Sequence, residues 1–218
     1  MVRNRLSDNI KGLTINEVEE EIIIGCLLGD GTLSKSGKFR RLRVEQKTAH
    51  KEYVDWKFSR LKRLCITPPQ SNPKNKSFRF GTVGHPKLSD LYSIFYDKDR
   101  SINPKILNKV SNLSIAIWFM DDGYRIHNTV GISANNFSLV ALGQLREILA
   151  AHGISTSLQN DKRGKRIYIS TKSLKPFNNL VKPYVDQVQC MAYKLPNPVE
   201  TTRKLPGNRD EDIVQSSQ

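Results

Sequence analysis

The chain has 218 residues, which is enough for one large domain or two small fused ones. It carries 35 Lys and Arg against 21 Asp and Glu, a formal net charge of +14, so we expect a polyanionic partner such as nucleic acid. No apolar run reaches the roughly 20 residues that cross a bilayer, residues 1–11 lack the apolar core of a signal peptide, and no basic amphipathic helix indicates a membrane surface.

The cysteines point to a reducing compartment. They are odd in number, far apart and set in apolar surroundings, at Cys26, Cys65 and Cys190. This pattern argues against a disulfide framework and against a zinc cluster. Together with the missing signal peptide, it predicts an intracellular protein that is not secreted, from a bacterial or archaeal cytoplasm or from an organelle.

The first half of the chain is predicted to run from residue 17 to residue 97. Residues 1–16 are polar and basic, and we expect a loosely ordered lead-in there. Asn16 is a helix-capping residue with Glu19 three positions later, so a helix is predicted over residues 17–30. The remaining elements are two strands, a helix, a hairpin and a helix, at residues 32–34, 39–46, 50–64, 66–71 with 77–83, and 85–95.

The same order of elements recurs after a polar linker over residues 98–111. The second half, residues 112–198, is predicted to contain a helix, two strands, a helix, a hairpin and a helix, at residues 113–122, 124–127, 130–134, 138–152, 156–160 with 166–170, and 174–184. Each half therefore has the order αββαββα, which predicts an α+β fold built from an internal repeat. Residues 199–218 are expected to be disordered.

Two apolar stretches, residues 22–31 and 114–123, look like copies of one another near the start of each half. Each contains a small residue and closes with Asp-Gly, which matches Asp30 with Asp122 and Gly31 with Gly123. The runs are typical of buried helices, and the two closing glycines are expected to leave them in a left-handed turn. Two unrelated core helices that each end in Asp-Gly are the alternative.

Side-by-side packing of these two helices would create a site. Gly25 and Gly29 stand four residues apart, so they share one helix face that a second helix can approach closely. An aspartate at a helix C-terminus is unfavourable because of the helix dipole, and a bound cation would reverse the penalty. Asp30 and Asp122 would then meet at one end, and paired carboxylates suit divalent-metal chemistry at a phosphate. The free backbone carbonyls of Gly29 and Asp121 are candidate further ligands.

Basic side chains gather on the predicted strands and turns, where they are candidate contacts to phosphates and guanine edges. The turn at residues 161–165 is almost entirely basic, and a basic β-ribbon is a shape that enters a major groove. Ordinary solvated strand faces are the alternative. The candidates for DNA binding are Lys35, Lys38, Arg40, Arg41, Arg43, Arg79, Arg125, Lys162, Arg163, Lys165 and Arg166.

The two Asp-Gly stretches resemble the signature of the LAGLIDADG homing endonucleases, in the single-chain form with two motifs. Residues 118–123 are the more specific match, and the resemblance covers about residues 17–198. It implies two halves related by a pseudo-two-fold axis, packed through the motif helices, with saddle-shaped antiparallel sheets over the major groove. It also implies a monomeric enzyme that hydrolyses double-stranded DNA at a long asymmetric site, for intron mobility, with Mg²⁺ or another divalent cation such as Mn²⁺.

The resemblance also implies catalytic roles, with Asp30 and Asp122 as the metal ligands. Gln46 occupies a position at which a polar side chain orders water around the metal. The counterpart of Gln46 in the second half is either Ser133 or Asn135, and the sequence leaves the two open.

Lys194 lies in a C-terminal segment, residues 191–197, that resembles the family's means of bringing a lysine to the active site. Such a lysine would stabilise charge on phosphorus or shift the proton equilibrium of the attacking water. The matching first-half position holds Gly84, with His85 or Lys87 as possible replacements. Unequal cutting rates on the two strands follow as an expectation.

Two alternative functions use the same fold. One is an RNA maturase that binds intron RNA and assists group I intron splicing. The other is a DNA-binding protein, such as a transcription regulator, that does not cut. Intact Asp30 and Asp122 favour the nuclease.

Overall fold

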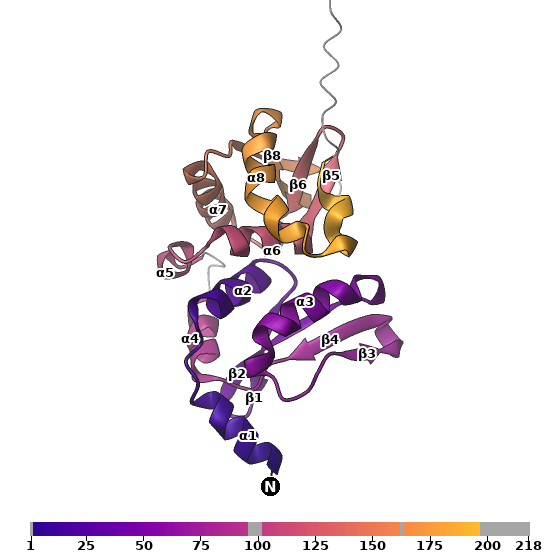
Figure 1. Ribbon diagram of the computed structural model, residues 1–218. Helices are drawn as coiled ribbons and strands as arrows, with labels where there is room; N and C mark the ends of the chain where they lie inside the picture. The colour runs from indigo at the N-terminus through magenta and orange to yellow at the C-terminus, as the bar shows by residue number, and fades with distance from the viewer. Residues whose placement is uncertain (1, 96–101, 162–163, 197–218) are drawn as a thin grey trace, which may run out of the picture.

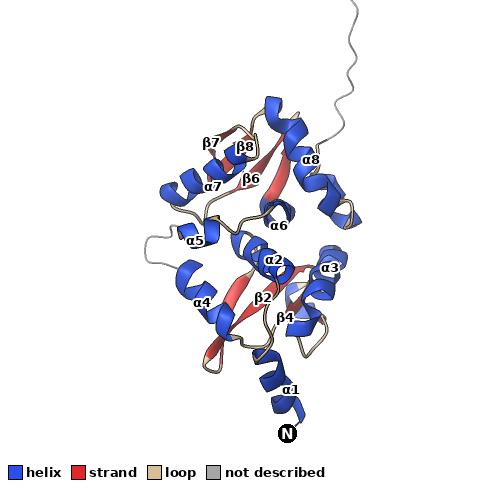
Figure 2. Ribbon diagram, turned by 60° about the vertical axis from the view of Figure 1, so that its left-hand side comes forward, coloured by secondary structure: helices blue, strands red, loops and turns tan. Residues whose placement is uncertain are grey.

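The computed structural model describes residues 2–95, 102–161 and 164–196. Two helices from distant parts of the sequence, α2 (Glu17–Leu28) and α6 (Asn112–Asp122), lie side by side at the centre of the molecule (Figure 1). Figure 2 shows one sheet on each side of this helix pair. The predicted α+β architecture of two halves packed through the motif helices is therefore confirmed.

Each half contains a four-stranded antiparallel sheet with the same topology. The strand order is β1-β2-β4-β3 in the first half and β5-β6-β8-β7 in the second. The first half comprises α2, β1 (Thr32–Ser36), β2 (Phe39–Lys47), α3 (Lys51–Leu61), β3 (Gln70–Asn72), β4 (Ser77–Gly81) and α4 (Pro86–Phe95). The second comprises α6, β5 (Gly123–Ile126), β6 (Thr129–Ser133), α7 (Leu139–Ala151), β7 (Thr156–Asp161), β8 (Gly164–Ile169) and α8 (Leu174–Val185). The predicted αββαββα repeat is thus present in both halves.

Short elements join these units. The helix α5 (Pro104–Leu107) lies within the predicted linker, and its Ile106 is buried. Five short 3-10 helices complete the described chain, η1 (Thr48–His50), η2 (Lys62–Leu64), η3 (Pro73–Asn75), η4 (Thr171–Ser173) and η5 (Gln189–Lys194). Within the described ranges, no helix is both long and apolar enough to cross a bilayer.

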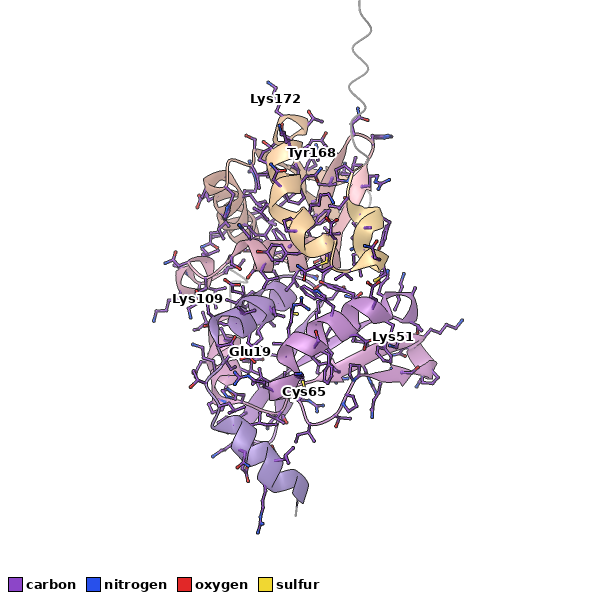
Figure 3. All side chains as sticks on the ribbon, viewed as in Figure 1. Glu19, Lys51, Cys65, Lys109, Tyr168 and Lys172 are labelled. Atoms are coloured by element: carbon purple, nitrogen blue, oxygen red, sulfur yellow. The ribbon has the colours of Figure 1, made fainter. Side chains whose placement is uncertain are left out.

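The start of α2 is fixed by the capping residues that the sequence predicted. The Asn16 side chain accepts a hydrogen bond from the Glu19 amide, and the Glu19 carboxylate accepts one from the Asn16 amide. Glu19 is itself buried and paired with Arg63 at 2.8 Å. Lys109, from the segment before α6, pairs with Glu20 at 2.6 Å and so lies at the same end of α2 (Figure 3).

The glycine face of α2 packs directly on α6, as predicted. A Cβ atom at Gly25 would lie 2.8 Å from the Cβ of Ile117 and 2.9 Å from the Ser114 carbonyl oxygen. One at Gly29 would lie 2.5 Å from the Cβ of Asp121. Real Cβ atoms do not approach other heavy atoms so closely, so only glycine permits the observed distance between the two helices.

The predicted left-handed turns at the ends of these helices are wrong. Gly123 has φ −75° and ψ 152°, and Gly31 is also outside the left-handed region. These glycines are required by space instead, because a Cβ at Gly31 would meet the Cys26 carbonyl oxygen at 2.7 Å and one at Gly123 would overlap the Phe119 ring. The chain passes from α6 directly into β5, and from α2 into β1 through a short turn at Gly29 and Asp30.

The N-terminus is also more ordered than predicted. The expected loose lead-in contains α1 (Val2–Lys11), which projects from the first half away from the second (Figure 1). Ile10 is buried, and the Leu13 carbonyl oxygen lies 2.9 Å from the His85 ring. An apolar contact and a backbone hydrogen bond therefore anchor a segment that composition alone marks as polar. The predicted disordered tail, residues 199–218, lies outside the described residues.

Gly25→Ala is expected to lower the free energy of unfolding by about 1–3 kcal/mol, because the added methyl group overpacks the α2–α6 contact. Gly143→Ala in α7 is the matched control, since a Cβ there meets nothing within 4 Å. Removing glycine from a helix interior without a clash stabilises by up to about 1 kcal/mol, so the control should move in the opposite direction. Urea unfolding of both variants measures the difference, and a stabilised Gly25→Ala protein would contradict the close packing.

Candidate functional site

Three carboxylates meet at the shared C-terminal end of α2 and α6. Asp30 follows Gly29, the last residue of the α2 cap, and Asp121 and Asp122 are the final residues of α6. The Asp121 carboxylate accepts a hydrogen bond of 3.3 Å from the Asp30 amide. We call Asp30, Asp121 and Asp122 the aspartate cluster. Its formation brings together the two aspartates that the repeat predicted, Asp30 and Asp122.

Asp122 carries a strongly perturbed carboxyl group. Burial first, and then the neighbouring charges of Asp30 and Asp121, raise its pKa to about 7. Within the described ranges, no three His, Cys, Asp or Glu side chains are arranged to hold a metal ion by themselves. Asp30 and Asp122 offer two carboxylates, and a divalent cation can be held by one or two carboxylates when water and substrate phosphates complete its shell.

Gln46 lies in the aspartate cluster, where the sequence predicted it. It stands near the end of β2, and its side-chain amide donates hydrogen bonds to Asp30 at 2.8 Å and to Asp121 at 3.1 Å. The amide therefore links an aspartate that follows α2 to one that ends α6. A group in this position is suited to orient a water molecule beside the carboxylates.

The second-half counterpart of Gln46 is neither of the two residues that the sequence offered. In the first sheet Thr32 pairs with Arg43, and in the second Tyr124 pairs with Gly131. The register thus matches Gln46 with Ala134, which is buried. Ser133 projects to the opposite face of the sheet, and the Asn135 side chain lies against Gly164. The prediction failed because β1 and β5 lead into hairpins of different length.

Lys57 completes the site and was not predicted. Its Nζ lies 2.8 and 3.1 Å from the two carboxylate oxygens of Asp121, and the two side chains are 1% and 0% exposed. Burial alone would lower the pKa of Lys57, but the Asp121 carboxylate overcomes this and raises it above its ordinary value. Because Lys57 belongs to α3 and Asp121 to α6, the ion pair joins the two halves.

One sequence signal for Lys57 was available. It lies among the core residues Tyr53, Val54, Trp56 and Leu61 of α3, and its ammonium group stands 4.0 Å from the centre of the Tyr53 ring. A lysine on an apolar helix face requires a buried partner. The identity of that partner depends on the packing of the two halves.

Lys194 reaches the aspartate cluster from η5. Its Nζ donates hydrogen bonds to the Met120 and Asp121 carbonyl oxygens at 2.5 and 2.7 Å. Burial lowers the pKa of Lys194, against the opposing effect of the three aspartates. The Asp121 carbonyl, a predicted metal ligand, is therefore already engaged by an ammonium group, although a carbonyl oxygen has a second lone pair.

The predicted first-half counterparts of Lys194 lie elsewhere. Gly84 packs against Ser36, where a Cβ would lie 2.7 Å from the Ser36 carbonyl oxygen. The His85 ring contacts the backbone of residues 13 and 87, and Lys87 pairs with Glu20 at 3.5 Å, at the opposite end of α2. The match was wrong because Gly84 precedes α4 whereas Lys194 follows α8. In the order of elements, a position equivalent to Lys194 would follow α4 (Pro86–Phe95).

The first sheet has a basic open face. Arg41 and Arg43 of β2 and Arg79 of β4 line a groove of about 470 Å³ together with Gln70. Leu42 and Val44 point to the buried face. Lys35 and Arg40, two of the predicted DNA contacts, are opposite one another in the β1–β2 register. They lie on the same side of the sheet as Leu42.

Arg40 does not belong to the basic face. Its guanidinium group stacks 3.7 Å from the centre of the Tyr92 ring of α4. Lys38 is exposed in the turn between β1 and β2. Side chains alternate along β2, so the predicted basic residues are divided between the two faces of the sheet. The sequence alone, in which these residues are close together, did not show this division.

The open face of the second sheet is less charged and more aromatic. Strand register places Tyr124, Arg166 and Tyr168, which Figure 3 labels, on one side. Arg166 donates hydrogen bonds to Gln159 at 2.9 and 3.1 Å. Arg125 projects to the helix side and donates to the Leu195 carbonyl oxygen at 3.0 Å.

The remaining basic residues of the second sheet lie near its tip. Lys165 pairs with Asn160 in the β7–β8 hairpin, on the face opposite to Arg166. The predicted contacts Lys162 and Arg163 are outside the described residues. The basic ribbon proposed for this hairpin thus rests on the sequence alone.

Lys57→Met is expected to lower the free energy of unfolding by about 3–5 kcal/mol, because it leaves Asp121 buried without its partner. Lys51→Met is the matched control, since Lys51 pairs with Asp55 on the exposed surface of the same helix. Exposed pairs contribute up to about 1 kcal/mol. If urea unfolding shows equal decreases in the free energy of unfolding for the two variants, the buried Lys57–Asp121 pair stabilises the protein no more than an exposed pair does.

Asp122→Asn is expected to raise the melting temperature of the metal-free protein at pH 8. The folded pKa of about 7 lies above the ordinary value of 3.8, so folding retains a proton and stability falls as the pH rises between these values. Asparagine does not ionise, so the variant does not lose stability in this way. The difference in melting temperature between the variant and the wild type should therefore shrink toward pH 4. Thermal melts with a chelator measure it, and Asp186→Asn, whose side chain is 51% exposed, should show no such trend.

Comparison with known proteins finds similar chains, among them two endonucleases and a maturase. DNA endonuclease I-ChuI from Chlamydomonas applanata is 26% identical over 212 residues, which cover 84% of this chain and 96% of that protein. Cytochrome b mRNA maturase bI2 from Debaryomyces hansenii is 28% identical over 195 residues, which cover 81% and 73%. The structure of the homing endonuclease I-WcaI bound to its DNA recognition sequence superposes with a TM-score of 0.73 at 26% identity, covering 86% of this chain and 91% of that one.

The family model matches a continuous stretch of this chain. It is the model of the LAGLIDADG DNA endonuclease family, and it aligns with residues 20–177, from α2 into α8. The matched region includes both motif helices, both sheets and the aspartate cluster. The chain belongs to the LAGLIDADG DNA endonuclease family.

Proposed function

We propose that this protein is a homing endonuclease that cuts double-stranded DNA at a long asymmetric site as a monomer. The aspartate cluster carries this proposal, because one chain supplies both motif aspartates, Asp30 and Asp122, at a single end of the α2–α6 pair. The similarity to I-WcaI, which is bound to its DNA recognition sequence, supports it over most of the chain.

The two open sheet faces are the proposed DNA-binding surface. Each would lie along the major groove, with the aspartate cluster over the intervening minor groove, which is about 6 Å wide. The first face offers the guanidinium groups of Arg41, Arg43 and Arg79, whereas the second offers Arg166 and tyrosine side chains. Phosphate contacts set most of the affinity, and base contacts set the sequence. Two unlike faces require two unlike half-sites.

A divalent cation such as Mg²⁺ or Mn²⁺ is the proposed cofactor, held by Asp30 and Asp122. When bound, it would polarise the phosphoryl oxygen and supply the attacking hydroxide. Burial, and then the charges of Asp30 and Asp121, raise the pKa of Asp122, and this supports the assignment because a cation between the carboxylates would offset their repulsion. Backbone oxygens of Gly29 and Asp121 are proposed as further ligands.

The protein's own groups divide the remaining roles unequally between the halves. Gln46 would orient the attacking water through its side-chain amide, and Ala134 offers no equivalent in the second half. Lys194 would stabilise negative charge on the phosphate from the second half. The asymmetry supports unequal cutting of the two strands.

RNA maturase activity is the second candidate, and the similarity to maturase bI2 favours it. The same basic faces would bind a folded intron, and the aspartates would not be needed. Splicing assays with the intron RNA that surrounds the coding sequence test this function separately. A protein that binds DNA without cutting would bind the duplex and leave it intact in Mg²⁺.

Asp30→Asn and Asp122→Asn should each abolish double-strand cleavage while changing DNA affinity by less than about tenfold, roughly 1.4 kcal/mol. Asparagine keeps the shape of the side chain and removes the charge that holds the cation. The substrate is a duplex selected by cleavage from a randomised pool in Mg²⁺, and affinity is measured by fluorescence anisotropy with a chelator. Asp186→Asn serves as the surface control.

Nicking by one of these variants and not the other would show which aspartate serves which strand. If both variants still cut both strands at near the wild-type rate, the aspartate cluster is not the active site. Wild-type protein that selects no cleavable duplex would refute the endonuclease itself.

A further inference from the structure

The segment that carries Lys194 is held by the opposite half of the molecule. The 3-10 helix η5 follows α8 in the second half, yet it packs against α3 of the first. The two oxygens of the Glu52 carboxylate accept hydrogen bonds from the backbone amides of Gln189 at 2.8 Å and Cys190 at 2.9 Å. One carboxylate in α3 thus holds both amides at the start of η5.

A second group of contacts lies one helical turn further along α3 and also holds the chain next to η5. The Gln187 side-chain oxygen accepts hydrogen bonds from Arg60 at 2.7 Å and from the Trp56 ring nitrogen at 3.2 Å. Arg60 stacks 3.9 Å from the centre of the Trp56 ring, which fixes its orientation. We call Glu52, Trp56 and Arg60 the α3 clamp.

We propose that the α3 clamp positions Lys194 in the active site and that Glu52 is a positioning residue for cleavage. The proposal rests on the endonuclease function proposed above. It is carried by geometry, because Glu52 fixes the first two residues of a six-residue element whose last residue is Lys194. The ammonium group of Lys194 then reaches the Met120 and Asp121 carbonyl oxygens at the end of α6.

Contacts at the other end of η5 do not replace the clamp. Arg125 binds the Leu195 carbonyl oxygen from within the second half, and His50 stacks on the half-exposed Tyr193 ring at 6.1 Å. These interactions follow or flank Lys194, whereas the clamp sets where the element begins. Backbone amides of Cys190 and Gln189 also hold the pKa of Glu52 below its ordinary value, so its carboxylate is charged at neutral pH.

The arrangement gives α3 two separate functions in one site. Lys57 on its buried face neutralises Asp121, and Glu52 at its start places Lys194. A lysine from the second half is therefore aligned only when the two halves are docked. Displacement of a catalytic group by about 1 Å can reduce a rate by about a hundredfold.

Single-turnover cleavage of the selected duplex at saturating enzyme tests the clamp. Glu52→Gln should lower the rate about tenfold and change affinity by less than about threefold, because it replaces one of the two acceptor oxygens with an NH2 group that cannot accept a hydrogen bond from a backbone amide. Asp55→Asn is the matched control, since Asp55 lies on the same helix, carries the same charge and pairs only with Lys51 among its described ion pairs. It should cut at the wild-type rate.

A double-mutant cycle shows whether Glu52 acts through Lys194. In a Lys194→Met background, Glu52→Gln should cause no further loss of rate, since the group that it positions is gone. An equal, additional loss in that background would overturn the proposal, as would a Glu52→Gln enzyme that cuts like wild type. A merely destabilising change would not produce this dependence on Lys194.

Hydrogen exchange separates failure of the clamp from failure of the endonuclease. In Glu52→Gln, peptides that contain residues 188–195 should exchange at least about threefold faster than in wild type, whereas Asp55→Asn should leave them unchanged. This measurement needs no DNA cleavage. Unchanged exchange would refute the clamp even in an active enzyme, and faster exchange in a protein that cuts no DNA would refute only the proposed function.

Discussion

The close contact between α2 and α6 is the constraint on which the rest of the structure depends. Gly25 and Gly29 remove the side chains that would hold the two helices apart, and their Cβ positions are occupied by atoms of Ile117 and Asp121. This close packing has an electrostatic cost, because it brings three carboxylates together at helix C-termini, where the helix dipoles already disfavour negative charge. The buried Lys57–Asp121 ion pair compensates part of this charge and leaves Asp30 and Asp122 as the proposed ligands of a cation.

The two halves repeat one topology but do not repeat one site. Gln46 corresponds in register to Ala134, and Lys194 follows the third helix of the second half, after α8. The sheets differ as well, since the first presents Arg41, Arg43 and Arg79 and the second presents mainly Arg166 and tyrosines. The two halves therefore share one backbone topology, but the side chains that they contribute to the site differ.

Contacts across the halves give the site its precision. Asp121 of the second half is bound by Gln46 and Lys57 of the first, and η5 of the second half is held by Glu52 of the first. Groups that stand far from one another in the sequence therefore share one rigid frame. Rigid support of this kind is what keeps catalytic groups within the small displacements that cleavage tolerates.

The sequence by itself determined the repeat, the two motif helices and the pairing of Asp30 with Asp122, and its resemblance to a known family pointed to Gln46 and Lys194. Hydrophobic period, capping residues and glycine spacing are local signals, and they sufficed for these elements because each signal lies within a short stretch of the chain. Only the tertiary structure decided the role of Lys57, the division of Arg40 and Arg41 between two sheet faces, and the match of Gln46 to Ala134. These depend on strand register and on how the halves dock, which bring together residues that no local pattern relates.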